Sequence, residues 1–411
     1  MYVLVLPVSG RGFVSQLAIL QHLCGSKFVP DLTLSSSGGN VAAYVVAAAN
    51  WKWPAIERIS RELTQDLFAR PWNSVSSLAL IVGYFEGNVY NKGSGVYDFL
   101  SKYFTSETIT KYEIWTGTYN KSRQKARLFC NRSKDDSIMD VSCIDHELTQ
   151  SMEPVFTKGN IQTIAKAGIA SASIPAIVPA EIIDSEPYID GGIAGASPLT
   201  IMQEPILKYI KDKDAPLHIV YVNSVDLSSP NLKPCHNVLD TWRQATHDLV
   251  RSQTVIDRLS GYELLRCQPG SMHKEEFACN YANMERVKEI QSKIKYSMLE
   301  IYPIERCDID IVSFNGEDVI NAMRKAYSKC RCRLWWLAPT EWTSHCQNES
   351  SNIPDCSRCS ICSGNILDSI NNCSETDSIN DQTIPACSRD ICKLLKECKN
   401  CNISEPVIRV P

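Results

Sequence analysis

Two successive strand–turn–helix units at the start of the chain constrain its fold more than any other feature. Residues 2–7 have the pattern of a buried strand, which leads through the turn at residues 9–12 into a helix over about 14–23. A second strand over 29–34 breaks at a run of serines and glycines and continues as a small-residue helix over 40–50. Because strand, tight turn and helix in alternation build parallel sheets, the sequence predicts an α/β protein.

Further elements follow the same pattern, although residues 51–160 are less clear. We expect a hairpin-like stretch over 112–129, a buried strand over 217–223, an amphipathic helix over 238–259, and a strand followed by a helix over 308–329. No internal repeat is visible.

The end of the chain has a different composition. Residues 343–411 contain no Phe, Tyr or Trp and are rich in Ser, Asn, Asp and Cys. Such a segment buries too little apolar surface to offset its ordering entropy. The sequence therefore predicts a folded domain over 1–335 and a Cys/Ser/Asn-rich, mostly disordered tail over 336–411.

Charge and cysteine distribution exclude several classes of protein. The formal net charge is -4, so no whole-chain basic field is available and we expect no nucleic-acid partner. The apolar start of the chain ends within seven residues, too short for a signal peptide or a membrane span. Eleven of the 18 cysteines lie between residues 330 and 401, so the core is not cysteine-dense. We expect a soluble, cytoplasmic protein.

Residues 35–39, Ser-Ser-Ser-Gly-Gly, occupy a strand-to-helix junction. A serine at such a turn is held with its hydroxyl above the sheet, and small neighbours are needed because the backbone is cramped. This pattern selects Ser37, flanked by Ser35 and Gly39, as a candidate nucleophile. The amide of Gly38 would lie at a helix N-terminus, where it favours a developing oxyanion. A connecting turn without chemistry is the alternative for this segment alone.

Two other short segments are weak signals taken singly. Ser9-Gly10-Arg11-Gly12 follows the first strand, where a glycine turn can point several amides at one spot. Asp190-Gly191-Gly192 ends a strand-like passage, and its carboxylate could accept a proton from Ser37. An ordinary βα turn, a phosphate-binding loop and an ordinary Asp-Gly turn are the alternatives.

Together the three segments resemble one family, the patatin-like phospholipases. That family carries a glycine-rich loop with a basic residue, then a Gly-x-Ser-x-Gly elbow, then a distant Asp-Gly-Gly or Asp-Gly-Ala. This chain has residues 9–12, Ser37 with Gly39, and residues 190–192 in the same order. Residues 170–175, Ala-Ser-Ala-Ser-Ile-Pro, are similar to the stretch that precedes the family's aspartate. The resemblance covers roughly residues 1–335.

The resemblance implies a three-layer α/β/α patatin-like fold and a lipid acyl hydrolase with a Ser–Asp dyad. Ser37 would attack a fatty-acyl ester carbonyl, and Asp190 would take its proton and later activate water. The amides expected to hold the oxyanion are those near Gly10, Arg11, Gly12 and Gly38. The expected partner is a phospholipid or another acyl-ester lipid at a peripheral membrane surface, and no cofactor is expected.

Departures from the family pattern motivate a second hypothesis. Val8 and Ser9 stand where the loop usually has glycine, Ser35 replaces the first glycine of the elbow, and Ala196 stands where asparagine is common. The alternative is therefore a catalytically impaired patatin-fold protein that acts as a binding or scaffolding module through its Cys-rich tail. A Ser-His-Asp hydrolase using His218 is the nearest chemical rival, although that histidine lies in an apolar strand.

The last aromatic residues lie beside basic ones. Residues 324–333 contain five Lys and Arg, and Trp335, Trp336 and Trp342 follow. This composition suits an anionic membrane surface, and Cys330 and Cys332 could accept acyl chains. The alternative is a final helix that packs its aromatic side chains on the domain.

Two cysteine pairs of the tail have the two-residue gap of a zinc knuckle. These zinc candidates are Cys356, Cys359, Cys398 and Cys401. The long interval between the pairs favours a tail without metal.

Overall fold

The computed structural model describes residues 1–67, 69–71, 90–92, 95–143, 152–175, 178–192, 197–224, 238–304 and 314–338. Contacts divide the chain into two units, Met1–Gln268 with Lys274–Trp336, and Pro269–His273 with Leu337–Pro411. The expected tail, its domain boundary and the four zinc candidates stay predictions, because residues 339–411 lie outside the described part of the chain.

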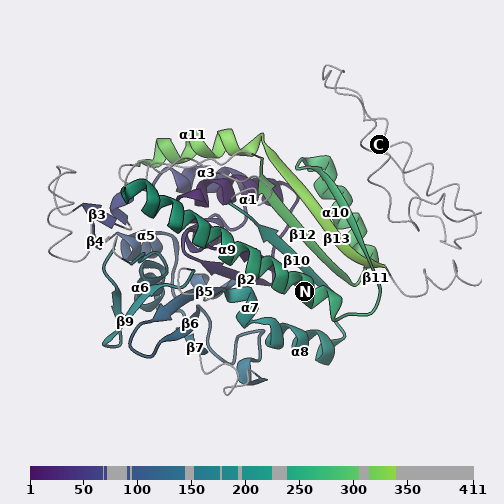
Figure 1. The fold of residues 1–411 in the computed structure, drawn as a ribbon, viewed down its shortest axis with the longest axis horizontal. Coiled ribbons are helices and arrows are strands. Elements are labelled where there is room, and N and C mark those ends of the chain that lie inside the picture. Colours follow the sequence, from purple (N-terminus) through teal and green to yellow (C-terminus); the bar gives the residue numbers. More distant parts are fainter. Residues whose placement is uncertain are drawn as a thin grey trace, which may run out of the picture. The chain divides into compact units, whose positions relative to one another are not determined.

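A largely parallel sheet forms the centre of the larger unit (Figure 1). Its strand order is β11-β13-β12-β10-β1-β2-β5-β6-β7, with β9 pairing beside β5 and β8 beside β9. The central strands, all mutually parallel, are β12 (Tyr296–Pro303), β10 (Leu217–Val222), β1 (Tyr2–Leu6), β2 (Leu32–Ser36) and β5 (Glu113–Asn120). Nearly all their residues are buried, as expected for parallel strands covered on both faces. The predicted α/β class is confirmed.

Antiparallel strands complete both edges of the sheet. β6 (Lys125–Cys130) forms with β5 the hairpin expected over 112–129, and β13 (Cys330–Ala338) runs antiparallel to β12. The remaining strands of this sheet are β7 (Met152–Phe156), β8 (Glu181–Ile183), β9 (Glu186–Asp190) and β11 (Ser271–Ala278). A separate small sheet pairs β3 (Ala69–Pro71) with β4 (Tyr90–Lys92).

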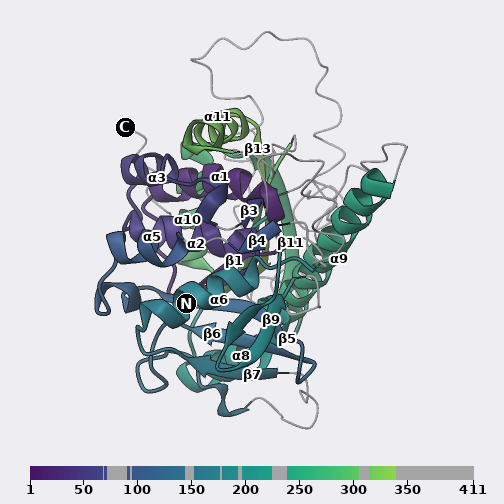
Figure 2. The same cartoon turned by 90° about the vertical axis from the view of Figure 1, so that its left-hand side faces the viewer.

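Helices cover the two faces of the sheet, as Figure 2 shows. One side holds α1 (Phe13–Gly25), α2 (Gly38–Ala48), α3 (Trp53–Ser60), α5 (Val96–Tyr103), α10 (Tyr281–Lys293) and α11 (Gly316–Tyr327). These helices share one apolar core with the sheet. The long helix α9 (Val238–Arg266) lies on the other side and contacts α7 (Pro198–Ile201) and α8 (Gln203–Lys213). The layers are therefore helix, sheet and helix.

Shorter elements connect these layers. α6 (Ile161–Ser171) begins at Asn160, whose side chain accepts a hydrogen bond from the Thr163 amide, and it packs against α2, α5 and β5. Single 3-10 turns occur at Gly10–Gly12, Gln65–Leu67, Thr108–Thr110 and Val141–Cys143. None of the helices in the described ranges is long and apolar enough to cross a membrane.

The expectation of a final helix beyond residue 330 is wrong, because this segment is strand β13. Cys332 and Leu334 point into the core, while Arg331 is exposed and Arg333 forms an ion pair with Glu276. Cys330 and Cys332 are buried and form no disulfide, so they are not placed to accept acyl chains. Pairing with β12 supplies the hydrogen bonds that a helix would have made internally.

Candidate active site

Ser37 forms a sharp turn between β2 and α2. Its backbone has φ 54° and ψ -130°, a region that residues other than glycine rarely occupy. Immediately after it, a Cβ on Gly38 would lie 2.2 Å from the Gly10 carbonyl oxygen, and one on Gly39 would lie 2.2 Å from that of Leu6. Both positions therefore require glycine, and the junction has the strained geometry of a nucleophile elbow.

The serine that replaces the first elbow glycine is accommodated. The Ser35 hydroxyl is fully buried, and its one proton has two acceptors within reach, the Asn40 Oδ1 at 3.2 Å and the Trp115 carbonyl at 3.1 Å. Thr116 donates to the same Asn40 oxygen at 2.7 Å. Burying a hydroxyl group that has hydrogen-bond partners costs little free energy, so Ser35 does not by itself distort the turn.

Strand β5 brings the ends of two distant strands together. β2 runs parallel to β5 and ends with Ser36 opposite Gly117. β9 runs antiparallel along the same strand and ends with Asp190 opposite Thr118. Because Gly117 and Thr118 are adjacent, β2 and β9 meet head to head, and the residues at their ends face each other.

Asp190 is a fully buried carboxyl group beside Ser37. Burial raises its pKa to about 7, while the Ser37 hydroxyl and the Gly192 amide act in the opposite direction. The Gly192 amide donates to Oδ1 at 2.8 Å. Oδ2 makes no hydrogen bond of ordinary length with any described residue, so it remains for Ser37.

The two glycines after Asp190 are required by close packing. A Cβ on Gly191 would lie 2.7 Å from the Thr118 nitrogen, and one on Gly192 would lie 2.5 Å from the Val8 Cβ. Val8, one of the departures from the family pattern, therefore contacts the turn that carries Asp190. Residues 193–196, which include Ala196, lie outside the described residues.

The first loop places backbone amides against the elbow. Gly10 has φ 49° and begins the 3-10 turn, and its carbonyl group lies against Gly38. The Gly12 amide donates to the Ser9 carbonyl at 2.9 Å, and its expected role in an oxyanion hole stays a prediction. The amides of Gly10, Arg11 and Gly38 remain candidates because first-turn amides lack intrahelical acceptors. The Arg11 side chain lies outside the described set.

Comparison with known proteins agrees with this geometry. Residues 9–202 match the family model described as patatin-like phospholipase, and the match includes the loop, the elbow and Asp190. The chain carries a patatin-like phospholipase domain. A domain of this kind supports lipid acyl hydrolase activity on lipid esters in general. No curated protein matches the chain.

The patatin-like domain also holds the two candidate residues, Ser37 and Asp190, with residues to which sequence reasoning assigned no role. The Ser37 amide donates to the Ser171 hydroxyl at 2.8 Å, and this hydroxyl donates to the Gly117 carbonyl at 2.8 Å. The Asp190 amide donates to the Ser173 carbonyl at 3.1 Å. The end of α6 thus contacts the backbones of both dyad residues. The sequence marks this segment by its run of small residues and by its likeness to the stretch that precedes the family's aspartate, but neither signal assigns a role to a single residue.

His218, the rival base, is remote from Ser37 and Asp190. It pairs with Tyr2 at the start of β1, whereas Ser37 follows the end of β2. Its ring contacts the Ser297 hydroxyl at 2.9 Å, and burial lowers its pKa to about 4. Histidine at this position is a buried residue of the core. Within the described residues, no group of three or more His, Cys, Asp and Glu could hold a metal ion.

Proposed function

We propose that the chain hydrolyses fatty-acyl ester bonds of phospholipids through a dyad of Ser37 and Asp190. The strained elbow that presents Ser37 to a fully buried carboxyl group carries this proposal. The match to patatin-like phospholipases supports it at the level of lipid esters. We propose that the protein is cytoplasmic and acts at the surface of membranes, because its phospholipid substrate lies in membranes.

Asp190 supplies the base. A carboxylate with an ordinary pKa near 3.9 is a poor acceptor for a hydroxyl proton, but burial raises the pKa of Asp190 to about 7. A base with a pKa near the working pH combines sufficient ionisation with proton affinity. The Ser37 oxygen attacks the ester carbonyl carbon as its proton passes to Oδ2 of Asp190.

Donors from the first loop and the elbow would hold the oxyanion that forms. The amides of Gly10, Arg11 and Gly38 are the backbone candidates. The Ser9 hydroxyl is buried, has no hydrogen-bond partner among the described residues, and lies beside Gly38. A buried polar group without a partner calls for an explanation, and donation to the oxyanion would provide one. The serine that departs from the family pattern would then add a donor.

The cycle closes with water and needs no other group. Collapse of the tetrahedral intermediate expels the lysolipid alcohol, which takes the proton from Asp190 and leaves an acyl ester on Ser37. Water then attacks this ester while Asp190 accepts its proton. The second collapse releases the fatty acid and returns the proton to the Ser37 oxygen.

An apolar cavity beside the nucleophile helix supports an acyl substrate. Its volume is about 30 Å³, and it is lined by Asn40 and by apolar side chains from α2, α5 and α6, among them Tyr44, Phe99 and Ile164. Asn40 follows Ser37 by three residues. Because the cavity is small, a fatty-acyl chain enters it only if α5 and α2 separate.

Liposome hydrolysis with mass spectrometry of the products tests the proposal. Wild-type protein in the presence of a chelator is expected to release fatty acid, and Ser37→Ala is expected to release none. The masses of the lysolipids also identify the bond that is cut. If folded wild-type protein releases no fatty acid, the dyad proposal fails and the binding or scaffolding alternative is favoured.

A further inference from the structure

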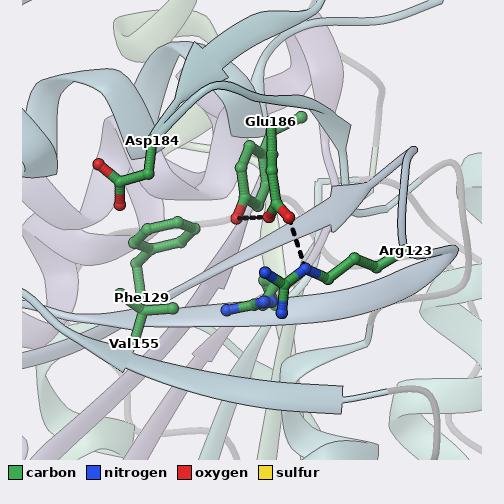
Figure 3. A pocket seen from close by; sticks show the side chains of 7 residues that line it. Arg123, Phe129, Val155, Asp184 and Glu186 are labelled. Carbon is green, nitrogen blue, oxygen red and sulfur yellow. Dashed lines mark hydrogen bonds and ion pairs between the residues drawn. The ribbon is translucent and has the colours of Figure 1, made fainter.

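A polar pocket lies beside β9, apart from the dyad (Figure 3). Its volume is about 180 Å³. The walls come from Phe129 and Tyr188, which are buried, and the polar lining consists of Arg123, Arg127, Asp184 and Glu186. This pocket has no part in the acyl transfer proposed above, so its combination of charges and aromatic rings calls for a separate account.

Opposite charges occupy different parts of this pocket. The Arg123 Nε donates to the Glu186 Oε1 at 2.5 Å. The side-chain Nδ2 of Asn120 donates to the other oxygen of the same carboxylate at 2.6 Å. The hydrogen bond from Arg123, and further the charge of Arg127, lower the pKa of Glu186, so both guanidinium groups lie near this carboxylate. In Figure 3, Asp184 lies on the other side of the Phe129 ring from Arg123. The pocket thus has a cationic part, an aromatic ring and an acidic part.

The pocket lies on the same face of the sheet as the base of the dyad. Glu186, Tyr188 and Asp190 are alternate residues of β9, so their side chains point to one face. Arg127 and Asp190 both pair with Thr118, from opposite edges of β5. Arg127 and Asp190 are therefore separated by two strand spacings, which places their Cα atoms about 10 Å apart. In a glycerophospholipid, a few bonds separate an acyl ester from the phosphate, which is a span of this order.

We propose that this pocket binds the zwitterionic headgroup of a phospholipid, with the phosphate at Arg123 and Arg127 and the ammonium group between Phe129 and Asp184. The inference rests on the proposed function, because it places the headgroup of the lipid that Ser37 cleaves. A guanidinium carries five N–H donors in a planar fork, so Arg123 can pair with Glu186 and with a phosphate oxygen. An ammonium group gains from an aromatic face and a nearby carboxylate.

The charge balance distinguishes this ligand from a simple anion. Two guanidinium groups and two carboxylates line the pocket, so a purely anionic headgroup meets no net positive charge. A headgroup that carries one charge of each sign finds a partner for both. Choline and ethanolamine phospholipids share this chemistry, and a free phosphodiester lacks the cationic half.

Direct binding tests the inference without any need for turnover. Phosphocholine is titrated by calorimetry into full-length Ser37→Ala protein, and glycerol 3-phosphate is titrated as the anionic comparison. We expect saturable binding of phosphocholine to this protein. When Asp184→Asn or Arg123→Gln is introduced separately into the same Ser37→Ala background, the affinity should weaken about tenfold. Glycerol 3-phosphate is expected to respond to Arg123→Gln and not to Asp184→Asn. Both substituted side chains are substantially exposed, so the fold should survive, and thermal unfolding checks this.

A matched control uses another ion pair of similar exposure. Arg286 pairs with Glu275 at 2.8 Å between α10 and β11, at the opposite edge of the sheet from the pocket. Arg286→Gln should leave the phosphocholine affinity unchanged. Absence of saturable binding, or equal weakening by Arg286→Gln, would overturn the inference and reduce the pocket to a surface ion-pair cluster.

Hydrolysis separates this inference from the proposed function. Wild-type protein should cleave phosphatidylcholine faster than phosphatidylglycerol in mixed micelles, and Asp184→Asn should reduce this ratio. Phosphocholine binding without any ester hydrolysis supports the headgroup site and contradicts the proposed function. Hydrolysis that shows no headgroup preference, in a protein that does not bind phosphocholine, supports the proposed function and contradicts the headgroup site.

Discussion

Replacing Asp190 with asparagine should slow hydrolysis by orders of magnitude and stabilise the fold at the same time. Asparagine keeps the size of the side chain, and its Oδ1 can accept from the Gly192 amide as Asp190 does. Its Nδ2 can donate to the Ser37 hydroxyl. The variant loses the ionisable carboxyl group. This group acts as the base when it is ionised, and burial favours its protonated form.

The expected size of the stability gain follows from the pKa. Burial raises the pKa of Asp190 from 3.8 to about 7. Between these values the folded protein keeps a proton that the unfolded chain has lost, so stability is full below pH 3.8 and falls as the pH rises through 7. At about 1.4 kcal/mol per pKa unit, the total loss is about 4 kcal/mol, and about 2–3 kcal/mol of it falls between pH 5 and pH 8. The asparagine of the Asp190→Asn variant does not ionise and avoids this loss.

Urea unfolding at pH 5 and at pH 8 measures the effect. The stability of Asp190→Asn relative to wild type should increase by about 2–3 kcal/mol between the two pH values. Asp212→Asn, at an exposed carboxylate of α8, should show no such change. Loss of the general base should lower kcat by about 10²–10⁴-fold. A relative stability that does not change with pH would refute the buried, raised-pKa carboxyl group.

Further predictions concern the groups around the dyad. Asp190 must be ionised to act as the base, so kcat/KM for a soluble p-nitrophenyl ester should depend on pH. It should fall about tenfold per pH unit below about pH 7 and level off above that pH. A value of kcat/KM that stays constant from about pH 5 to pH 8 would contradict this. Ser171→Ala leaves the Ser37 amide without its acceptor, so urea unfolding should show a loss of about 1–3 kcal/mol and kcat should fall, whereas Ser171→Thr, which keeps the hydroxyl, should restore part of both. Ser9→Ala should lower kcat by about 10²-fold with little change in KM if its hydroxyl donates to the oxyanion; an unchanged kcat would remove Ser9 from that role.

Local sequence patterns predicted the framework that carries the site. The strand and helix on each side of Ser37 follow from an apolar run that breaks at serines and glycines, and the structure has β2 and α2 there. The hairpin of β5 and β6 and the helix α9 were likewise expected from periodicity. Such elements are predictable because burial patterns repeat over neighbouring residues.

The contacts that complete the site are distant in sequence and could not be read from these patterns. Nothing local places Asp190 opposite Thr118, or the Ser171 hydroxyl beneath the Ser37 amide. Such contacts depend on how β5 pairs with two strands along one edge. The misread strand β13 is a different case. Apolar and basic residues alternate over 330–334, a strand signal that the neighbouring tryptophans obscured.

Labelling with a serine-directed fluorophosphonate, followed by peptide mass spectrometry, tests the central claim most directly. A single adduct is expected on Ser37 of the folded protein. The adduct should be absent from Ser37→Ala, and it should form much more slowly with Asp190→Asn and below pH 7. No adduct on folded wild-type protein, or an adduct on another serine that Asp190→Asn does not slow, would contradict the dyad of Ser37 and Asp190.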